Sequence, residues 1–432
     1  MNPAGHWKSG ARCSLRAMAL LAAVSWFPTS FLLGQSPVRL TLQDMLSRIR
    51  ADHPVNQQTQ ASINAAVARA ASLSRLDNPS VQYEKVLLDR TWFLAQPIRW
   101  PWEFGPLRRL GVAQVQEARA AAQLDVQTVA LAAAQRFADG IHSREVLGLA
   151  IDAESLAVLG LNRTTAARQM GQGGDLQVLQ ARVSLDAARR ARVAASEESR
   201  AAAASVAILI GQPPDSALEL VGSLRDLAPV SLPDSLLDSV AVTSDVELNR
   251  LSSQAERADR EAKVARSKMI PEIQVGPTYG FIDAPCVPGI MCHPKFWGFI
   301  FEAGLPLFNT RGDAVRAANS EKDASIAAQR SRKRELAAQI LEASALRSRA
   351  ESALGALRSG DLTRAAQAES LAVAALQQGG AFLTTWLAIH EAYLDARRAE
   401  LDLEWQAARA RLTLRYLTGT LLTEPSAPAE QR

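Results

Sequence analysis

Two cysteines separated by a short segment are the first candidates for chemistry in this sequence. Cys286 and Cys292 lie in the segment APCVPGIMCHP, whose prolines and glycine are typical of a turn. In an oxidising compartment, two cysteines that flank a short loop are expected to form a disulfide. Both thiolates together with His293 are also a possible zinc or copper site, although such sites usually have a fourth ligand. The sequence favours the disulfide and leaves the metal site as the alternative.

No other group of residues has the spacing of a catalytic or cofactor site. The five histidines are scattered, and the chain has no glycine-rich phosphate loop, nucleophile elbow or metal-binding helix pair. The formal net charge of +4 comes from basic residues interleaved with acidic ones, as in the stretch RKRE from Arg332. This pattern is typical of a solvated helix face and argues against nucleic-acid binding. We therefore expect no enzyme, no cofactor and no resident metal.

The composition indicates which elements carry these residues. The chain is 48% hydrophobic and rich in alanine, with only 5% aromatic residues. Long helices that pack at close range suit this composition better than a large globular core. The expected fold class is therefore mainly α with a small β part.

The first residues are typical of a targeting segment. Arg12 and Arg16 precede an apolar stretch from Ala17 to Gly34, which Pro28 interrupts. We expect residues 1–34 to be a signal peptide, with an uncleaved anchor as the alternative. No cysteine follows the apolar stretch, so a lipid anchor is not supported. The rest of the chain has no apolar run long enough for a membrane-spanning helix, and residues 423–432 are expected to form a disordered tail.

The sequence is duplicated over residues 35–222 and 223–422. Both halves run through helix, strand, strand, long helix and returning helix, and Pro271 corresponds to Pro79. Near the end, DAARRA from Asp186 corresponds to DARRA from Asp395, and one offset then places Gly211 on Gly419. A duplication of this length predicts two equivalent units, neither of which closes its own core.

The strand regions alternate between apolar and small or polar residues. In EIQVGPTYGF from Glu272 and in FWGFIFEAGL from Phe296, one face is apolar and aromatic. The first pair is less regular, because Lys85 stands where an apolar residue is expected. Tryptophans in or beside the strands would form an aromatic girdle at a membrane surface: Trp92, Trp100, Trp102 and Trp297. Four strands alone would leave unpaired edges in lipid, so other chains must complete the sheet.

The helices after the strands are unusually long. From about Pro106 to Met170, and from about Asp313 to Gln378, no proline interrupts the sequence, so each segment would span about 90 Å. Each ends in a glycine turn and returns as a helical hairpin, with apices at 170–175 and 377–382. The apolar spacing favours coiled-coil packing, and an ordinary helical bundle is the alternative.

The order of these features resembles the TolC-type outer-membrane efflux proteins. The resemblance extends from about Val38 to Leu422 and includes LTLQDML, NPS at Asn78, PLF at Pro306, LQVLQARVSLDAARR, LIGQPP and LTGT. It implies a homotrimer in which each chain gives four strands to one transmembrane β-barrel, continued by a coiled-coil helical barrel through the periplasm. It also implies a passive exit duct that works with a periplasmic adaptor (membrane fusion protein) and an inner-membrane RND-type transporter. NPS and the QPI at Gln96, followed by Arg108 and Arg109, are closer to the heavy-metal branch, so metal cations or small toxic molecules are the expected substrates.

Within this resemblance, the hairpin apices are the expected contacts with the adaptor. The residues are Met170, Gly171, Gly173, Gly174, Asp175, Gln378, Gly379 and Gly380. A tunnel constriction is expected at Asp175, Thr384 and Thr385, and three copies of Asp175 would form a ring of carboxylates that attracts cations. Asp175 also suits a helix N-cap after Gly174, and this second interpretation is favoured. A periplasmic coiled-coil adaptor is the alternative function, but such a protein would need a globular β-domain that the sequence does not show.

Overall fold

The computed structural model describes most of the chain after the predicted signal peptide. The described residues are 38–87, 89–171, 174–227, 234–270, 272–282, 284–287, 290–304, 311–378 and 383–422. The predictions for the signal peptide, the tail at 423–432, Gly173, Gly379 and Gly380 lie outside the described residues.

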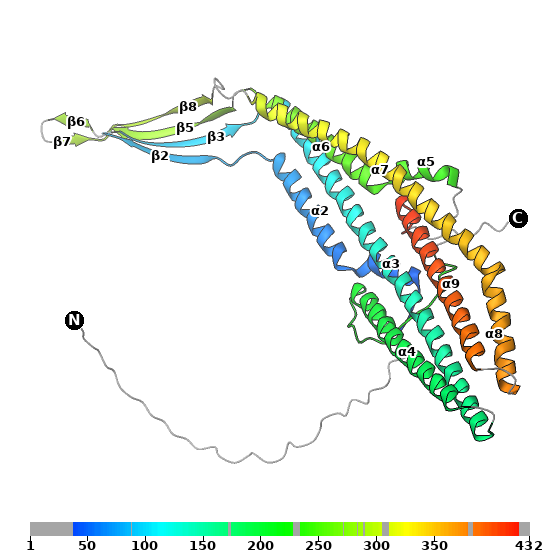
Figure 1. Cartoon of the computed structure of the whole chain (residues 1–432). Coiled ribbons are helices and arrows are strands. Elements are labelled where there is room, and N and C mark those ends of the chain that lie inside the picture. The colour runs from blue at the N-terminus through cyan, green and yellow to red at the C-terminus, as the bar shows by residue number, and fades with distance from the viewer. Residues whose placement is uncertain are drawn as a thin grey trace, which may run out of the picture. The chain divides into compact units, whose positions relative to one another are not determined.

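Nine helices are described, and the second half of the chain repeats the order of the first (Figure 1). The first half contains α1 (Leu42–Asp52), α2 (Pro54–Leu73), α3 (Pro101–Gln169) and α4 (Asp175–Leu209). The second half contains α5 (Asp234–Ser244), α6 (Val246–Ser267), α7 (Gly312–Ser359), α8 (Asp361–Gln378) and α9 (Leu383–Leu417).

A break between two short helices opens each half. His53 ends α1 in an extended conformation (φ −66°, ψ 139°), because the residue before a proline is restricted away from the helical region. Its Nδ1 accepts a hydrogen bond from the N–H of Val55, 3.1 Å away, at the start of α2. In the second half, Asp245 lies between α5 and α6 and accepts a hydrogen bond from the N–H of Leu248. The duplication therefore keeps the break while the residue that caps it has changed.

The long helices differ from the prediction at two points. The first begins at Pro101 rather than at about Pro106, because Pro101 suits the first turn, where no N–H partner is needed. The second is not continuous: α7 ends before Gly360 (φ −118°, ψ −91°), and α8 begins at Asp361. The expectation of one unbroken helix from Asp313 to Gln378 is wrong, because a glycine leaves helical geometry at low steric cost.

The main sheet contains four antiparallel strands in the order β2-β3-β5-β8. They are β2 (Ser80–Val86), β3 (Asp89–Ile98), β5 (Glu272–Ile282) and β8 (Lys295–Gly304), which are the strand regions that the alternation predicts. Between β5 and β8, a short hairpin is formed by β6 (Ala284–Val287) and β7 (Ile290–Cys292). A parallel pair of three-residue strands, β1 (Val38–Leu40) and β4 (Leu218–Leu220), is not predicted by the sequence.

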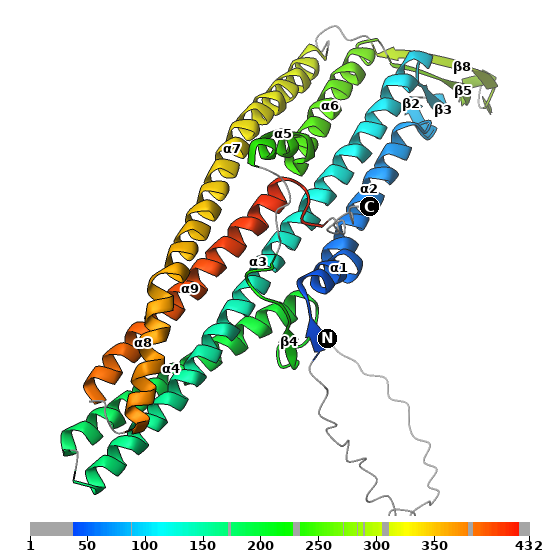
Figure 2. The same ribbon diagram turned by 90° about the vertical axis from the view of Figure 1, so that its right-hand side faces the viewer.

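The largest buried cluster surrounds the middle of α3. Ala130, Ala133, Ala134 and Phe137 are fully buried there, against α1, the β1–β4 pair and the end of α9. A Cβ atom on Gly140 would lie 2.3 Å from Cδ1 of Leu220 of β4, so a larger residue would force this buried side chain to move. Small residues therefore let the helices pack closely around α3, which Figure 2 shows running beside α4.

The two helical hairpins α3–α4 and α8–α9 lie next to each other, away from the four-stranded sheet (Figures 1 and 2). Ala181 of α4, Ala372 of α8 and Trp386 of α9 share one buried cluster that joins the hairpins. Over the described residues, none of these helices has both the length and the apolar character needed to cross a membrane.

Candidate functional site

One face of the four-stranded sheet carries a continuous line of aromatic residues. Tyr83, Trp92, Tyr279 and Trp297 are direct cross-strand partners from β2 to β8, so they share a face, and we call them the aromatic row. The rings of Tyr83 and Trp92 lie 4.7 Å apart between centroids. All four side chains are exposed in the single chain, Trp297 with 79% of its surface. Such a row is what a membrane headgroup region accommodates.

The same face continues as an apolar surface between the aromatic row and the strand ends that join the helices. Val81, Leu94, Phe299 and Phe301 lie on it, and Phe299 is 80% exposed. The opposite face carries smaller or polar residues at many positions: Gln82, Thr91, Thr278, Gly280, Gly298 and Glu302. The most exposed apolar side chains of β8 lie on the face of the aromatic row, and such a concentration indicates a surface that contacts lipid or another apolar partner.

The four tryptophans predicted to form a girdle lie at the two ends of the strands. Trp92 and Trp297 belong to the aromatic row. Trp100 and Trp102 follow the other end of β3, at the start of α3, where their rings stack 4.6 Å apart with an interplanar angle of 13°. Their predicted role in an aromatic girdle at a membrane surface stays a prediction.

The first hairpin apex is exposed and built from a tight glycine turn. Met170 is 66% exposed, and Gly171 has φ +74°, a conformation that favours glycine. Gly174, not Asp175, is the N-cap of α4, so the predicted cap is wrong. Asp175 is the first helical residue, and its carboxylate lies 2.6 Å from Nε of Arg168 across the turn. A carboxylate in the first turn still interacts favourably with the helix dipole.

The second apex is described only in part. Gln378, the last residue of α8, is exposed. Thr384 and Thr385 are exposed in the first turn of α9. Their predicted role in a constriction, like the docking role of both apices, concerns contacts with other chains and stays a prediction.

A buried aromatic and ionic cluster lies close to these apices. Trp386 of α9 is 1% exposed and packs against Gly160 of α3, where an added Cβ would lie 2.7 Å from its ring. The ring of His390 stacks on Trp386 at 5.3 Å, and its Nδ1 lies 2.9 Å from Oε1 of Glu369 on α8. This cluster connects α3, α8 and α9. No sequence pattern predicts this cluster, although a glycine inside a long helix, as at Gly160, is compatible with a close contact.

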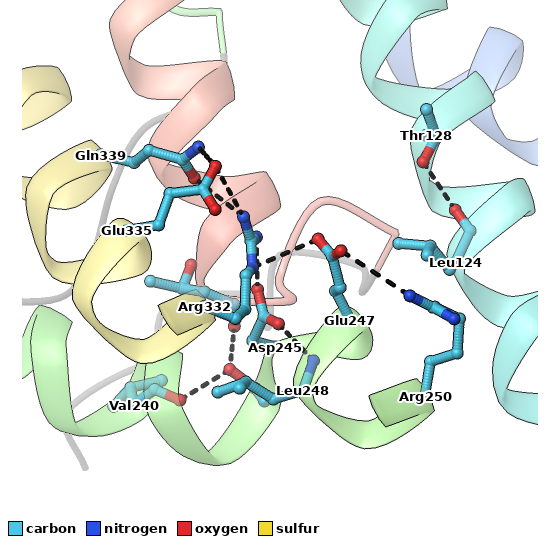
Figure 3. Close-up of polar contacts among 12 residues, drawn as sticks. Leu124, Thr128, Val240, Asp245, Glu247, Leu248, Arg250, Arg332, Glu335 and Gln339 are labelled. Carbon is cyan, nitrogen blue, oxygen red and sulfur yellow. Dashed lines mark hydrogen bonds and ion pairs between the residues drawn. The ribbon is translucent and has the colours of Figure 1, made fainter. Parts of the chain in front are cut away.

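A second buried network connects α7 to the break between α5 and α6 (Figure 3). Arg332 of α7 contacts Asp245 and Glu247, and Nη1 of the same guanidinium lies 3.6 Å from Glu335. Burial lowers the pKa of Arg332, but the hydrogen bond and charge of Asp245 outweigh it, so the net shift is upward. Arg332 therefore stays charged. The sequence showed it only as part of a basic stretch.

The joint at Gly360 lies beside a charged cleft of about 890 Å³. Arg358, at the end of α7, donates to Glu400 of α9 at 2.7 Å and also contacts Glu404. Glu145 of α3 faces the same cleft, and burial together with the charge of Glu404 raises the pKa of this carboxyl. The α7–α8 joint is thus tied to α9 by ion pairs.

Cys292 is disulfide-bonded in the structure. It lies at the end of β7, where it pairs with Ala284 of β6. The side chain of Cys286 lies outside the described residues, so the pairing of Cys286 with Cys292 stays a prediction. Among the residues that are described, no group of three or more histidine, cysteine, aspartate or glutamate side chains is arranged to hold a metal.

Comparisons with known proteins identify the fold. No protein-family model and no curated protein sequence matches the chain. A crystal structure of a membrane protein from Pseudomonas aeruginosa aligns with 88% of this chain and 93% of its own, at 16% identity and a TM-score of 0.70. The outer membrane protein VceC from Vibrio cholerae aligns over 88% and 96%, at 15% identity and a TM-score of 0.69. The Campylobacter jejuni CmeC outer membrane channel aligns over 89% and 87%, at 14% identity and a TM-score of 0.70.

These similarities cover nearly the whole of each chain, so they include both the sheet and the helical hairpins. At such low identity they establish the fold. The chain has the fold of outer-membrane channels, and the predicted resemblance to TolC-type proteins is confirmed at that level.

Proposed function

We propose that this chain is one subunit of a trimeric outer-membrane exit duct of a tripartite efflux system. The duct passively conducts metal cations or small toxic molecules to the exterior. An inner-membrane RND-type transporter and a periplasmic adaptor deliver them. The fold shared with outer-membrane channels supports this role.

The observation that carries the proposal is the apolar face on a sheet with open edges. In the described part of the chain, β2 and β8 are the outer strands and pair with no further strand on their free sides. Unpaired backbone groups cost several kcal/mol each in lipid. Pairing β8 of one copy with β2 of the next removes these edges, and three copies of four strands give a closed barrel of twelve.

Exposed apolar residues on the helices support assembly with further copies. Leu176, Leu179 and Val183 of α4 lie at helical spacing on one face and are 69%, 59% and 63% exposed. On the other hairpin, Leu371 of α8 is 71% exposed. A single soluble chain rarely leaves such residues uncovered, so neighbouring copies are the proposed cover. A tunnel built from α3 would extend about 100 Å.

The proposal is tested by cross-linking in native membranes. The chain, expressed in a Gram-negative host, is expected in the outer-membrane fraction and to give cross-linked products that stop at the trimer. The matched variant replaces Phe299 and Phe301 with serine, which removes apolar surface from the proposed lipid-facing side and should reduce membrane insertion. A monomer that is extracted without detergent would contradict the proposal.

We further propose that the hairpin apices bind the adaptor. Gly174 has φ −98°, and an added Cβ would meet nothing within 4 Å, so Gly174→Val fits the fold of the chain itself. We expect this variant to lose efflux-dependent resistance while the trimer yield is unchanged, because a valine would obstruct a closely approaching partner. Gly355→Val is the control, since Gly355 of α7 also has open space around it and lies away from the apices. Equal resistance in both variants would exclude docking at Gly174.

A further inference from the structure

The charged cleft beside the Gly360 joint is large enough to hold a small molecule. Its volume of about 890 Å³ lies in the range of ligand pockets. Its walls are formed by α3 and α9, two helices that pack against each other (Figure 2). The segment between β4 and α5 and the end of α7 complete the cleft. We call it the α3–α9 cleft, and all of the residues that line it belong to one chain.

The charges that line the α3–α9 cleft do not balance. Five of the lining side chains are carboxylates and three are guanidinium groups, so the formal charge of the cleft is −2. A cleft lined by an excess of one sign of charge attracts ions of the opposite sign. The α3–α9 cleft therefore favours a cation.

The three guanidinium groups are paired with carboxylates of α9. Arg358 donates to Glu400 at 2.7 Å and also contacts Glu404. Arg397 contacts Glu400 as well, and Nε of Arg225 lies 3.9 Å from the carboxylate of Glu404. The carboxylates of α9 are thus neutralised within the protein, and these arginines leave the rest of the cleft without a counter-charge.

Two carboxylates without such a partner lie on α3. Glu145 and Asp152 are seven residues apart, so they share one face of the helix and lie about 10 Å apart along its axis. Nη2 of Arg144 lies 3.8 Å from Glu145, and it donates instead to the carbonyl oxygen of Gly222 at 2.9 Å. The side chain of Asp152 forms no hydrogen bond or ion pair with any described residue.

The environment of Glu145 shows the effect of the missing cation. Burial, together with the charge of Glu404, raises the pKa of the Glu145 carboxyl. A positive group within a few ångströms would favour the ionised carboxylate. A bound cation would therefore relieve an unfavourable interaction that the folded chain contains.

The remaining lining offers contacts for an apolar group. Leu149 and Leu156 of α3 and Leu394 of α9 line the cleft beside the ring of Tyr393. Gly148 lies between the two carboxylates of α3, and an added Cβ there would meet nothing within 4 Å, so this part of the cleft is open. Leucine side chains and an aromatic ring accept the apolar part of a ligand, and the face of the ring also attracts a cation.

We propose that the α3–α9 cleft binds a small organic cation. Its positive group pairs with the carboxylates of α3, and its apolar part lies against the leucine side chains and Tyr393. A metal ion suits the cleft less well, because in the described part of the chain no three histidine, cysteine, aspartate or glutamate side chains are arranged to hold one. The site goes beyond the proposed duct, since it lies within one chain and needs neither the trimer nor export.

The test measures binding to the purified full-length protein in detergent by isothermal titration calorimetry. The probes are benzamidinium, an aromatic cation at neutral pH, and benzamide, a neutral molecule of nearly the same shape. We expect benzamidinium to bind on the order of tenfold more tightly than benzamide, because hydrogen bonds to a carboxylate are charge-assisted. The double variant Glu145→Gln, Asp152→Asn should remove this preference.

Two further variants locate the site. Gly148→Leu places a side chain in the open part of the cleft and should block benzamidinium, while thermal unfolding shows that the fold is kept. The matched double variant Asp125→Asn, Asp323→Asn removes two exposed carboxylates of α3 and α7 that do not line the cleft. It should bind benzamidinium like the wild type.

Any of four results would overturn the inference. They are equal binding of the two probes, wild-type binding of benzamidinium by the double variant of α3, wild-type binding by Gly148→Leu, and displacement of benzamidinium by magnesium ions at an equal concentration. The last result would show a site for any cation and not for an organic one. Tight and selective binding of benzamidinium by a chain that forms no trimer would support the site while the proposed function fails.

Discussion

Arg332 and Asp245 form a buried ion pair in which one carboxylate serves two helices. Nη2 of Arg332 donates to Oδ2 of Asp245 at 2.9 Å, while Oδ1 accepts the N–H of Leu248 at 2.6 Å. Both side chains are less than a tenth exposed. The carboxylate therefore caps α6 and at the same time holds α7 against the break between α5 and α6 (Figure 3).

The variant Arg332→Ala is expected to destabilise the protein by about 3–5 kcal/mol, because it leaves the buried carboxylate of Asp245 without its cation. Denaturant unfolding at fixed protein concentration measures the loss. Arg334→Ala removes an exposed neighbour on α7 and should change stability by less than about 0.5 kcal/mol. If both variants unfold at the same denaturant concentration, the ion pair does not hold α7.

A methyl group at position 160 should loosen the contact between the two hairpins. Gly160→Ala places a Cβ 2.7 Å from the buried ring of Trp386, and such overpacking costs about 1–3 kcal/mol. Gly148→Ala is the control on the same helix, because no atom lies within 4 Å of the added Cβ. It should stabilise α3 by about 0.5–1 kcal/mol. Thermal unfolding distinguishes the two changes by their opposite signs.

Adding Trp386→Phe to Gly160→Ala should restore part of the lost stability, since a smaller ring leaves room for the methyl group. A double variant that is no more stable than the sum of the single changes would show that the two residues are not coupled.

Asp259 should make stability depend on pH in the acid range. Hydrogen bonds from Lys263 of α6 and Lys322 of α7, at 2.5 and 2.7 Å, lower the pKa of Asp259 from 3.8 to about 2. Because the folded-state pKa is depressed, the stabilisation is present above the unfolded pKa of 3.8 and is lost as pH falls towards 2. Asp259→Asn should therefore be less stable than wild type at neutral pH, by at most about 2 kcal/mol.

The difference between Asp259→Asn and the wild type should disappear when unfolding is followed near the lower pKa of Asp259. Asp323→Asn, an exposed change on α7, gives the background effect of losing one carboxylate. A difference that stays constant over the whole acid range would contradict the role of the two lysines.

Mass spectrometry of the unreduced protein should show one intramolecular bridge between Cys286 and Cys292. The exterior of a cell is oxidising, and the hairpin β6–β7 brings the two segments together. The double variant Cys286→Ser, Cys292→Ser should still form the trimer, because the hairpin lies outside the four-stranded sheet. Two free thiols with a bound metal would instead support the alternative metal site with His293.

The sequence predicted the elements whose signals are local. Alternation from Glu272 and from Phe296 predicted β5 and β8, and the glycines near Met170 predicted the first apex. The duplication also appears in the helix ends, since Gly211 and Gly419 have φ +73° and +68° and follow α4 and α9 in the same way. These features depend on a few neighbouring residues, so a sequence pattern records them.

Features that depend on distant residues could not be predicted. Whether Gly360 or another glycine would interrupt the second long helix depends on Arg358 and its partners on α9, which are 42 and 46 residues away. The placement of Lys85 also depends on strand register, because Lys85 and Lys295 belong to one cross-strand line only in the folded sheet. The sequence showed Lys85 only as an exception to the apolar alternation of β2, and it could not show which residues of other strands share its line across the sheet.

The parallel pairing of β1 with β4 has a consequence for the order of folding. Arg39 of β1 bonds Glu219 of β4, 180 residues later, and Leu40 is fully buried in the same region. At about 5–20 residues per second, synthesis of the intervening chain takes roughly 10 to 40 seconds. The first described segment to be made must therefore wait for its partner, and a binding protein that shields Leu40 during this interval would prevent mispairing of the newly made chain.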